Sequence, residues 1–265
     1  IPGGGAISND VIASIIGNST DKSGIYALDD DSLNLSMACV PGITEENIQN
    51  TLITLAETSQ NFLAVVSPPA ALGSTQKAVN WHNGHGSSRS AAINSSYAAI
   101  YWPWLKTFDV GTASDIYMDP AAYAVSIMCH TDAVSDPWFA PAGLTRGRLT
   151  KPTDVEIILN QGDRDALYQP GNSINPIAKF AQDGICIWGQ KTAQRTPSAL
   201  DRVNVRRMMI VIRKMILAAT RSIVFEPNDP MTWNRVVNLL QPAMDDIRRR
   251  RGITEFRVVC DETTN

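Results

Sequence analysis

Apolar positions in this chain follow two spacings, one typical of β-strands and one typical of α-helices. Short apolar runs at residues 33–40 and 62–67 predict strands. Between them, residues 44–59 repeat apolar side chains three and four positions apart, which predicts a helix. Strand, helix and strand in this order form a βαβ unit with a right-handed crossover, so we expect parallel strands here.

The same interleaving continues along the chain. We predict helices at residues 74–83 and 120–133, and strands at residues 97–108 (interrupted by Pro103), 155–159, 177–180 and 185–188. Residues 1–31 are weakly patterned and open on a glycine run that we interpret as a linker. The fold class is therefore α/β, with a mixed, partly parallel sheet and helices packed on both of its faces.

A long amphipathic helix follows these strands. Ser198, with Asp201 three residues later, predicts a capped helix start. Arg206 and Arg207 lie outside its apolar stripe, so we expect one buried face and one cationic face. The stripe comprises Val205, Met208, Met209, Ile212, Met215, Ile216 and Ala219.

The last part of the chain predicts a short strand at residues 223–225 and a second helix. Asp229 caps that helix and Pro230 opens it. Pro242 is expected to kink or restart it. Residues 253–260, beyond a stop at Gly252, predict a closing strand.

Four consecutive arginines end this second helix, where cationic side chains complement the helix dipole. The run has three interpretations: a solvated helix end, a nucleic-acid contact, or a contact with another protein. Aromatic residues that stack bases are not interleaved with it, which weighs against nucleic acid.

Length and charge set wider limits. The 265 residues suffice for one large or two medium domains, and no apolar run approaches the ~20 residues that span a bilayer. Residues 1–150 carry six basic and thirteen acidic side chains, whereas residues 201–251 carry eleven basic and five acidic ones. This asymmetry predicts a polar contact with a partner. Because the chain starts at Ile1 and stops directly after a strand-like run, we expect a piece of a longer product.

The four cysteines lie far apart in apolar runs without the paired spacing of metal or redox sites. We predict buried free thiols and a reducing compartment during synthesis. They are Cys39, Cys129, Cys186 and Cys260.

The candidate chemistry is sparse. His82 and His85 lie in a Gly-rich segment that we interpret as an exposed loop rather than a metal site, and His130 as a surface or core histidine. The aspartates at 29–31 fit a solvated turn, and residues 189–192 lack the upstream glycine of a phosphate loop. We predict no catalytic, cofactor or metal residues. An α/β-scaffold hydrolase using His82 or His130, and a nucleic-acid-binding module using the basic helix, remain alternatives.

Several segments resemble, in one order, the core of the tail sheath proteins of large contractile-tailed bacteriophages, the myoviruses. The resemblance runs from about residue 33 to the end. Its segments are NPI at 175–177, WGQKT at 188–192, DRVNVRR at 201–207 and FEPND at 225–229, with PWFAPAGLTRGRL at 137–149, GDRDALY at 162–168 and EFRVVCDETTN at 255–265.

The resemblance implies a structural virion protein and not an enzyme. Such subunits stack as hexameric rings around a tail tube, exchange strands through terminal arms that we expect to be missing here, and contract to drive the tube through the host cell envelope. The implied partners are other copies, the tail tube protein, and the baseplate and tail terminator proteins, with no nucleic acid, cofactor or membrane insertion. The implied location is the virion, after assembly in the host bacterial cytoplasm.

Two sets of site residues and a domain division follow from the resemblance. The tail tube is expected to contact Asp245, Arg248, Arg249, Arg250 and Arg251. A neighbour's strand is expected to pair with the segment that carries Phe256, Val258 and Cys260. Residues 1–150 would belong to an outer or middle domain, and residues 151–265 to an inner core domain that faces the tube.

Overall fold

A computed structural model describes residues 7–30, 32–86 and 88–264 of the chain. The glycine run near the start and Asp31 of the predicted solvated turn lie outside the described residues. The chain divides into two compact units, Ile1–Arg207 (unit 1) and Met208–Asn265 (unit 2). Each unit is described by itself.

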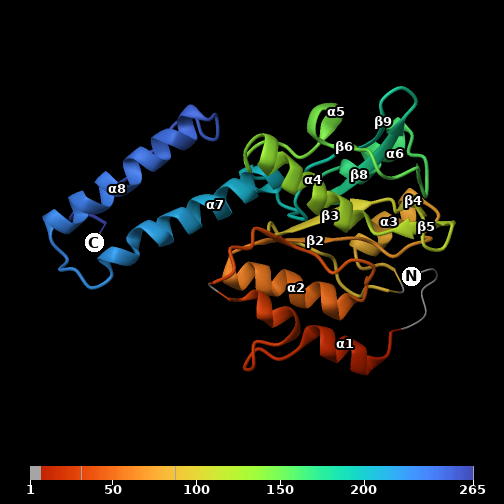
Figure 1. Ribbon diagram of the computed structural model, residues 1–265, viewed down its shortest axis with the longest axis horizontal. Coiled ribbons are helices and arrows are strands. Elements are labelled where there is room, and N and C mark those ends of the chain that lie inside the picture. The colour runs from red at the N-terminus through yellow and green to blue at the C-terminus, as the bar shows by residue number, and fades with distance from the viewer. Residues whose placement is uncertain (1–6, 31, 87, 265) are drawn as a thin grey trace. The chain divides into compact units, whose positions relative to one another are not determined.

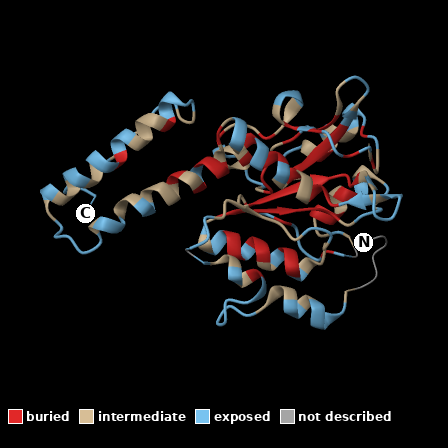
Figure 2. Ribbon diagram, in the orientation of Figure 1, coloured by how far each residue is buried: buried red, intermediate tan, exposed pale blue. Residues whose placement is uncertain are grey.

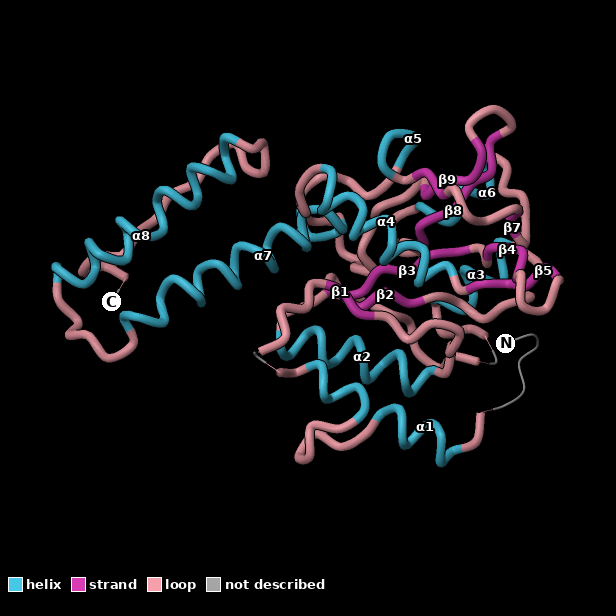
Figure 3. Tube along the Cα trace, in the orientation of Figure 1, coloured by secondary structure: helices cyan, strands magenta, loops and turns pink. Residues whose placement is uncertain are grey.

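Unit 1 is built on a six-stranded mixed sheet (Figures 1 and 3). Its first four strands in spatial order run parallel, and the remaining two are antiparallel to their neighbours. The order is β1 (Met37–Ala38), β2 (Leu63–Val66), β3 (Ala98–Trp102), β8 (Ile174–Phe180), β9 (Gly184–Ile187) and β6 (Arg148–Leu149). This confirms the α/β class and the βαβ start, although β1 pairs over only two of the eight residues predicted.

The single apolar strand predicted over residues 97–108 is two strands in different sheets. The chain bends at Pro103, which follows a cis peptide bond, and passes from β3 into a small antiparallel sheet. That sheet is ordered β5 (Ser114–Met118), β4 (Leu105–Asp109) and β7 (Asp154–Val155). The strand predicted at 155–159 shrinks to β7 because the following residues do not join the ladder.

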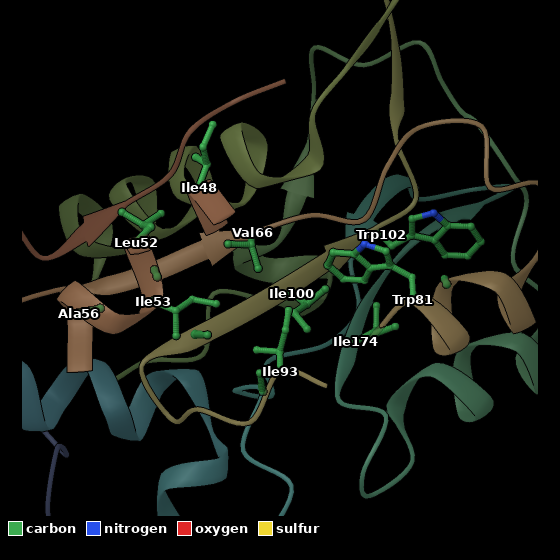
Figure 4. Packing of buried hydrophobic residues seen from close by; sticks show 14 of the residues in the cluster. Ile48, Leu52, Ile53, Ala56, Val66, Trp81, Ile93, Ile100, Trp102 and Ile174 are labelled. Atoms are coloured by element: carbon green, nitrogen blue, oxygen red, sulfur yellow. The ribbon is translucent and has the colours of Figure 1, made fainter. Parts of the chain in front are cut away.

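One face of the large sheet is covered by helices whose apolar residues form the main core. The predicted helix at 44–59 is α2 (Glu46–Ser59), and that at 74–83 is α3 (Thr75–His82), which Ser74 caps through its hydroxyl. Figure 4 shows Ile48 and Leu52 of α2, Trp81 of α3 and Ile100 of β3 in this core. Three further elements of unit 1 contribute residues to this core or pack against it: α1 (Asn9–Ile16), the 3₁₀ helix η1 (Gly24–Leu28) and α6 (Gln161–Tyr168).

The opposite face carries α4 (Pro120–Val134), which packs against β2 and β3. The short helix α5 (Gly143–Arg146) follows it. Figure 1 shows α2 and α4 on opposite sides of the sheet, and Figure 2 shows the buried residues concentrated along the strands between them. The expectation of helices on both faces is confirmed.

The division expected near residue 150 does not separate these folded units. Ile100 of β3 pairs in register with Ile174 of β8, so one sheet contains strands from both sides of that position. A sheet can span such a position because parallel strands that pair in space can be far apart in sequence. The assignment of residues 1–150 to an outer or middle domain and of residues 151–265 to an inner domain stays a prediction. The compact units instead divide within a helix, after Arg207.

That helix is α7 (Val203–Thr220), which begins in unit 1 and continues into unit 2. Ser198 caps a short 3₁₀ turn, η2 (Ala199–Asp201), rather than α7 itself. The predicted strand at 223–225 is not formed: residues 221–223 are a 3₁₀ turn, η3 (Arg221–Ile223), and Phe225 is fully exposed. Without a neighbouring strand, these residues keep the helical turn of the chain before them.

Candidate assembly surfaces

Helix α8 (Pro230–Arg249) carries the expected tube-contact residues at its end. Its start is as predicted, because the carboxylate of Asp229 accepts a hydrogen bond from the N–H of Thr232 at 2.8 Å and Pro230 occupies the first turn. The helix passes through Pro242 as one element instead of restarting there.

The arginine run is neutralised in part by its own helix. Arg248 pairs with Asp245 at 2.8 Å, and Arg249 and Arg250 pair with Asp246 at 3.3 and 3.5 Å. The arginine side chains of these pairs are at least half exposed, so each pair contributes only ~0.5 kcal/mol. A charged surface therefore remains available to a partner.

The chain leaves α8 through a tight backbone turn. The N–H of Gly252 donates to the carbonyl of Ile247 at 2.9 Å, and that of Arg251 donates to the carbonyl of Arg248 at 3.0 Å. Arg251, not Gly252, takes the left-handed conformation, with φ of 67°. These two bonds satisfy carbonyls that the helix end leaves open and fix where the last arginines stand.

The closing strand predicted at 253–260 is not formed within the described residues, because the segment has no ladder partner there. Its side chains nevertheless alternate as expected. Phe256, Val258 and Cys260 are half-buried, whereas Arg257 and Val259 are exposed. The guanidinium of Arg248 lies 5.7 Å from the centre of the Phe256 ring. This contact joins a predicted tube-contact residue, Arg248, to a predicted strand-acceptor residue, Phe256.

The cationic face predicted for α7 is wrong at its start. Arg207 is 2% exposed and pairs with Asp132 of α4 at 2.5 Å. Arg206 is 7% exposed, lies 4.0 Å from the centre of the Tyr97 ring, and donates to the hydroxyl of Ser96. The helical pattern predicted both residues to be exposed because it carries no information about their partners in unit 1, the carboxylate of Asp132 and the ring of Tyr97. In the apolar stripe, Met208 and Ile212 are buried but Met209 is 43% exposed.

The motifs at 175–177 and 188–192 are joined by buried hydrogen bonds and close packing. The buried amide of Asn175 donates to the carbonyls of Ile100 and Lys191, at 3.0 and 2.7 Å, and accepts from the N–H of Lys191 at 2.5 Å. Gly189 lies against Asn175 and Pro176, and a Cβ on it would come within 2.9 Å of their side chains. Lys191 donates to the carbonyl of Tyr168 at 2.7 Å, so its ammonium is held by the fold.

The histidines are placed differently from each other. His82 ends α3 and is fully buried, so the exposed-loop interpretation is wrong for it, while His85 and His130 are exposed. Burial, followed by the positive charge of Arg195 and Arg89, lowers the pKa of His82 to about 4. Among the residues that the structure describes, no three metal-binding side chains gather.

The prediction of buried thiols holds only for Cys186. Cys39 and Cys260 are half-buried and Cys129 is exposed on α4, and no disulfide joins the four cysteines in the part of the chain that the structure describes. Burial raises the pKa of the Cys39 and Cys186 thiols to about 11, which keeps them protonated at neutral pH. No helix in the described ranges has the length and apolar character needed to cross a membrane.

Two family models match successive parts of the chain. The model for the phage tail sheath protein central domain matches residues 24–193, and that for the phage tail sheath C-terminal domain matches residues 195–265. This chain belongs to the phage tail sheath protein family. The resemblance in the sequence motifs is thereby confirmed, and the models meet near the start of α7, close to the division between units 1 and 2.

Named relatives agree with this membership. The tail sheath protein of Vibrio phage KVP40 is 32% identical over 219 residues, which cover 78% of this chain and 32% of that protein. That of Enterobacteria phage T4 is 31% identical over 231 residues, which cover 84% of this chain and 35% of that protein. This sheath-family chain therefore spans about a third of the length of these relatives.

Solved structures share the fold. A chain of the anti-feeding prophage baseplate matches with a TM-score of 0.68 and 18% identity, over 97% of this chain and 70% of that one. A chain of an extracellular contractile injection system, the PVC sheath complex in its contracted state, matches with a TM-score of 0.69 and 22% identity, over 89% of this chain and 62% of that one. At these identities the likeness shows the fold of this family member.

Proposed function

We propose that this chain forms the core of a contractile tail sheath subunit, which polymerises as stacked hexameric rings around a tail tube and contracts to drive the tube through the host cell envelope. The observation that carries the proposal is the match of the two tail sheath domain models, one after the other, over nearly the whole chain. The partners are other copies, the tube protein, and the baseplate and terminator proteins. The subunit belongs to the virion and assembles in the bacterial cytoplasm.

Unit 1 suits a body that moves without changing shape. Its sheet is closed in by helices on both faces, and Asn175 ties β3, β8 and the segment after β9 together. Contraction then moves rigid bodies between two packings, and the free energy comes from the difference between their interfaces. A modest difference per subunit sums to a large one over many copies.

The alternating segment at 256–260 supports a proposal for the tether between copies. Phe256, Val258 and Cys260 are half-buried and alternate with exposed neighbours, and the segment is not part of any strand assigned in the described residues. A neighbour's arm would add a strand here, with main-chain hydrogen bonds providing affinity and the alternate side chains providing register. Such a tether persists while the bodies move.

The end of α8 supports a proposal for the tube contact. Asp245 and the arginines from Arg248 to Arg251 stand on a fixed helix end with exposed charge, and an acidic tube surface complements them. In this arrangement residues 151–265 include the tube-facing part, and residues before 150 lie farther out.

Electron microscopy tests the polymer directly. The complete protein that contains this sequence, expressed alone, is expected to form hollow tubes of stacked rings. The isolated chain, examined at the same concentration, is the comparison for the role of additional segments. Dispersed particles from the complete protein under assembly-favouring salt would contradict the sheath function.

Reversing the charge of the α8 end is expected to abolish tube attachment. We expect the triple variant Arg248→Glu, Arg249→Glu, Arg251→Glu to fold normally, because these side chains are exposed, and to lose co-sedimentation with assembled tail tubes. Arg235→Glu is the matched control, since Arg235 lies on the same helix and pairs with Glu226 at 3.5 Å. Attachment of the triple variant at the level of the control would remove the assignment.

A further inference from the structure

A rigid cation–aromatic stack stands at one end of the large sheet in unit 1. The rings of Phe180 on β8 and Trp188 after β9 meet edge to face with centroids 4.9 Å apart. The guanidinium of Arg164 on α6 lies 5.3 Å from the centre of the Phe180 ring and donates to the carbonyl of Leu159 at 2.9 Å. Trp188 is held in place by this stack and yet is 43% exposed.

The strand register adds Arg148 to the same face. Arg148 of β6 pairs with Cys186 of β9, which pairs with Ala178 of β8, and Phe180 lies two residues beyond Ala178. Side chains of directly paired residues, and of residues two apart on a strand, point to the same side of a sheet. The exposed Arg148 therefore shares its side with Phe180. We call Arg148, Arg164, Phe180 and Trp188 the arginine–aromatic face.

This composition is that of a protein-binding surface. Tryptophan and arginine are the residues that most often dominate the free energy of protein association. Because Trp188 is already stacked and Arg164 is already bonded, little side-chain freedom remains to be lost when a partner binds. A partner surface with carboxylates next to apolar side chains would complement the two arginines and the two aromatic rings of this face.

Such a surface lies at the other end of the same unit. The layer formed by α1 and η1 contains four exposed or half-exposed aspartates, Asp10, Asp21, Asp29 and Asp30, and only Lys22 as a basic residue, which pairs with Asp29. A hydrogen bond from Ser32 lowers the pKa of Asp30, which keeps that carboxyl ionised. Val11 on α1 is 47% exposed beside this charge. We call these residues the acidic layer.

We propose that the arginine–aromatic face of one copy binds the acidic layer of a second copy. The face stands at the β9 and β6 end of the strand order, and α1 and η1, which carry the acidic layer, pack against α2 on the side away from the sheet (Figure 1). Two different surfaces at opposite ends of one body give a head-to-tail contact, which builds rings or helices rather than closed pairs. The inference rests on the proposed function, because a polymer supplies the second copy.

A single-stranded nucleic acid is the other class of partner that stacks on exposed aromatic side chains. The observations favour protein. A single strand is bound along a positively charged groove on which successive bases stack, whereas this face has one ring pair and two arginines. Binding to an oligonucleotide is therefore an outcome to be tested, not the expectation.

Two variants each remove one of the surfaces. Trp188→Ala with Arg148→Glu removes the face, and Asp10→Arg with Asp30→Arg removes the acidic layer. In sedimentation velocity of the chain, each is expected to weaken self-association at least tenfold relative to the unmodified chain. Phe108→Ala is the control for loss of an exposed ring, since Phe108 is an aromatic residue of similar exposure (51%) on the small sheet. Thermal unfolding checks that all variants fold.

Mixing the two variants gives the decisive result. Each keeps one intact surface, so an equimolar mixture is expected to form dimers that grow no further. Absence of these dimers, or undiminished self-association of either variant alone, would overturn the proposal. So would loss of oligonucleotide binding in the Trp188 variant with self-association intact. Mixed dimers together with a complete protein that makes no tubes would support the contact and contradict the sheath function. Tubes formed by the complete protein carrying Trp188→Ala and Arg148→Glu would contradict the contact and leave the sheath function intact.

Discussion

Replacing Asn175 by alanine is expected to lower the free energy of unfolding of the chain by about 3 to 5 kcal/mol. The substitution removes three buried hydrogen bonds, two to carbonyls of Ile100 and Lys191 and one from the N–H of Lys191. The cost exceeds that of three ordinary hydrogen bonds because their partners stay buried without a replacement. Equilibrium unfolding in urea, followed by tryptophan fluorescence, measures the change.

Asn47→Ala is the control for this variant. Asn47 lies on the exposed side of α2, where alanine is the better helix former, so its replacement is expected to leave stability unchanged or slightly higher. Equal midpoints for the two variants would show that the amide of Asn175 does not hold the strands together. Gly189→Ala should resemble Asn175→Ala, because the added methyl group meets the same amide.

Acidification below pH 6.5 is expected to destabilise the folded chain through His82 by about 3 kcal/mol in total. The pKa of His82 is about 4 in the folded protein, against an ordinary value of 6.5, because burial disfavours the charged imidazolium. Between these values the unfolded chain binds the proton and the folded chain does not. Stability therefore falls as the pH falls from about 6.5 to about 4, and the loss is complete below that range.

The measurement is the free energy of unfolding at several pH values for the unmodified chain and for His82→Gln. Their difference isolates the histidine from carboxylates that titrate in the same range. It should change by about 3 kcal/mol across the window. A flat difference for His82 would mean that the folded state takes up the proton as readily as the unfolded one.

Local pattern predicted the elements whose partners are near in sequence. The helix α2 and the strand β2 follow from their apolar spacing, and the start of α8 follows from Asp229 and Pro230, whose capping chemistry is complete within a few residues. The sheet order could not be predicted in this way. The residues that separate paired strands such as β3 and β8 carry no signal of which strand they will meet.

The sequence also failed to predict those features of the candidate surfaces that depend on partners distant in the chain. The arginines at the end of α8 were found from the sequence, because a charged run at a helix end is visible as such, but the pairing of three of them with Asp245 and Asp246 depends on helix geometry. Arg207 was misplaced because its partner Asp132 is 75 residues away. Trp188 was visible only as part of a motif, since neither its exposure nor its contact with Phe180 has a local signature.

The pairing of β3 with β8 sets the order in which the protein can mature. Synthesis has to pass residue 174 before the central strand pair can close, and the segments proposed to bind other subunits in unit 2 emerge only after that. Sequence separations of this size make folding slow and leave strand edges open in the meantime. The segment proposed to accept a neighbour's strand therefore leaves the ribosome only after both members of the central strand pair have been synthesised.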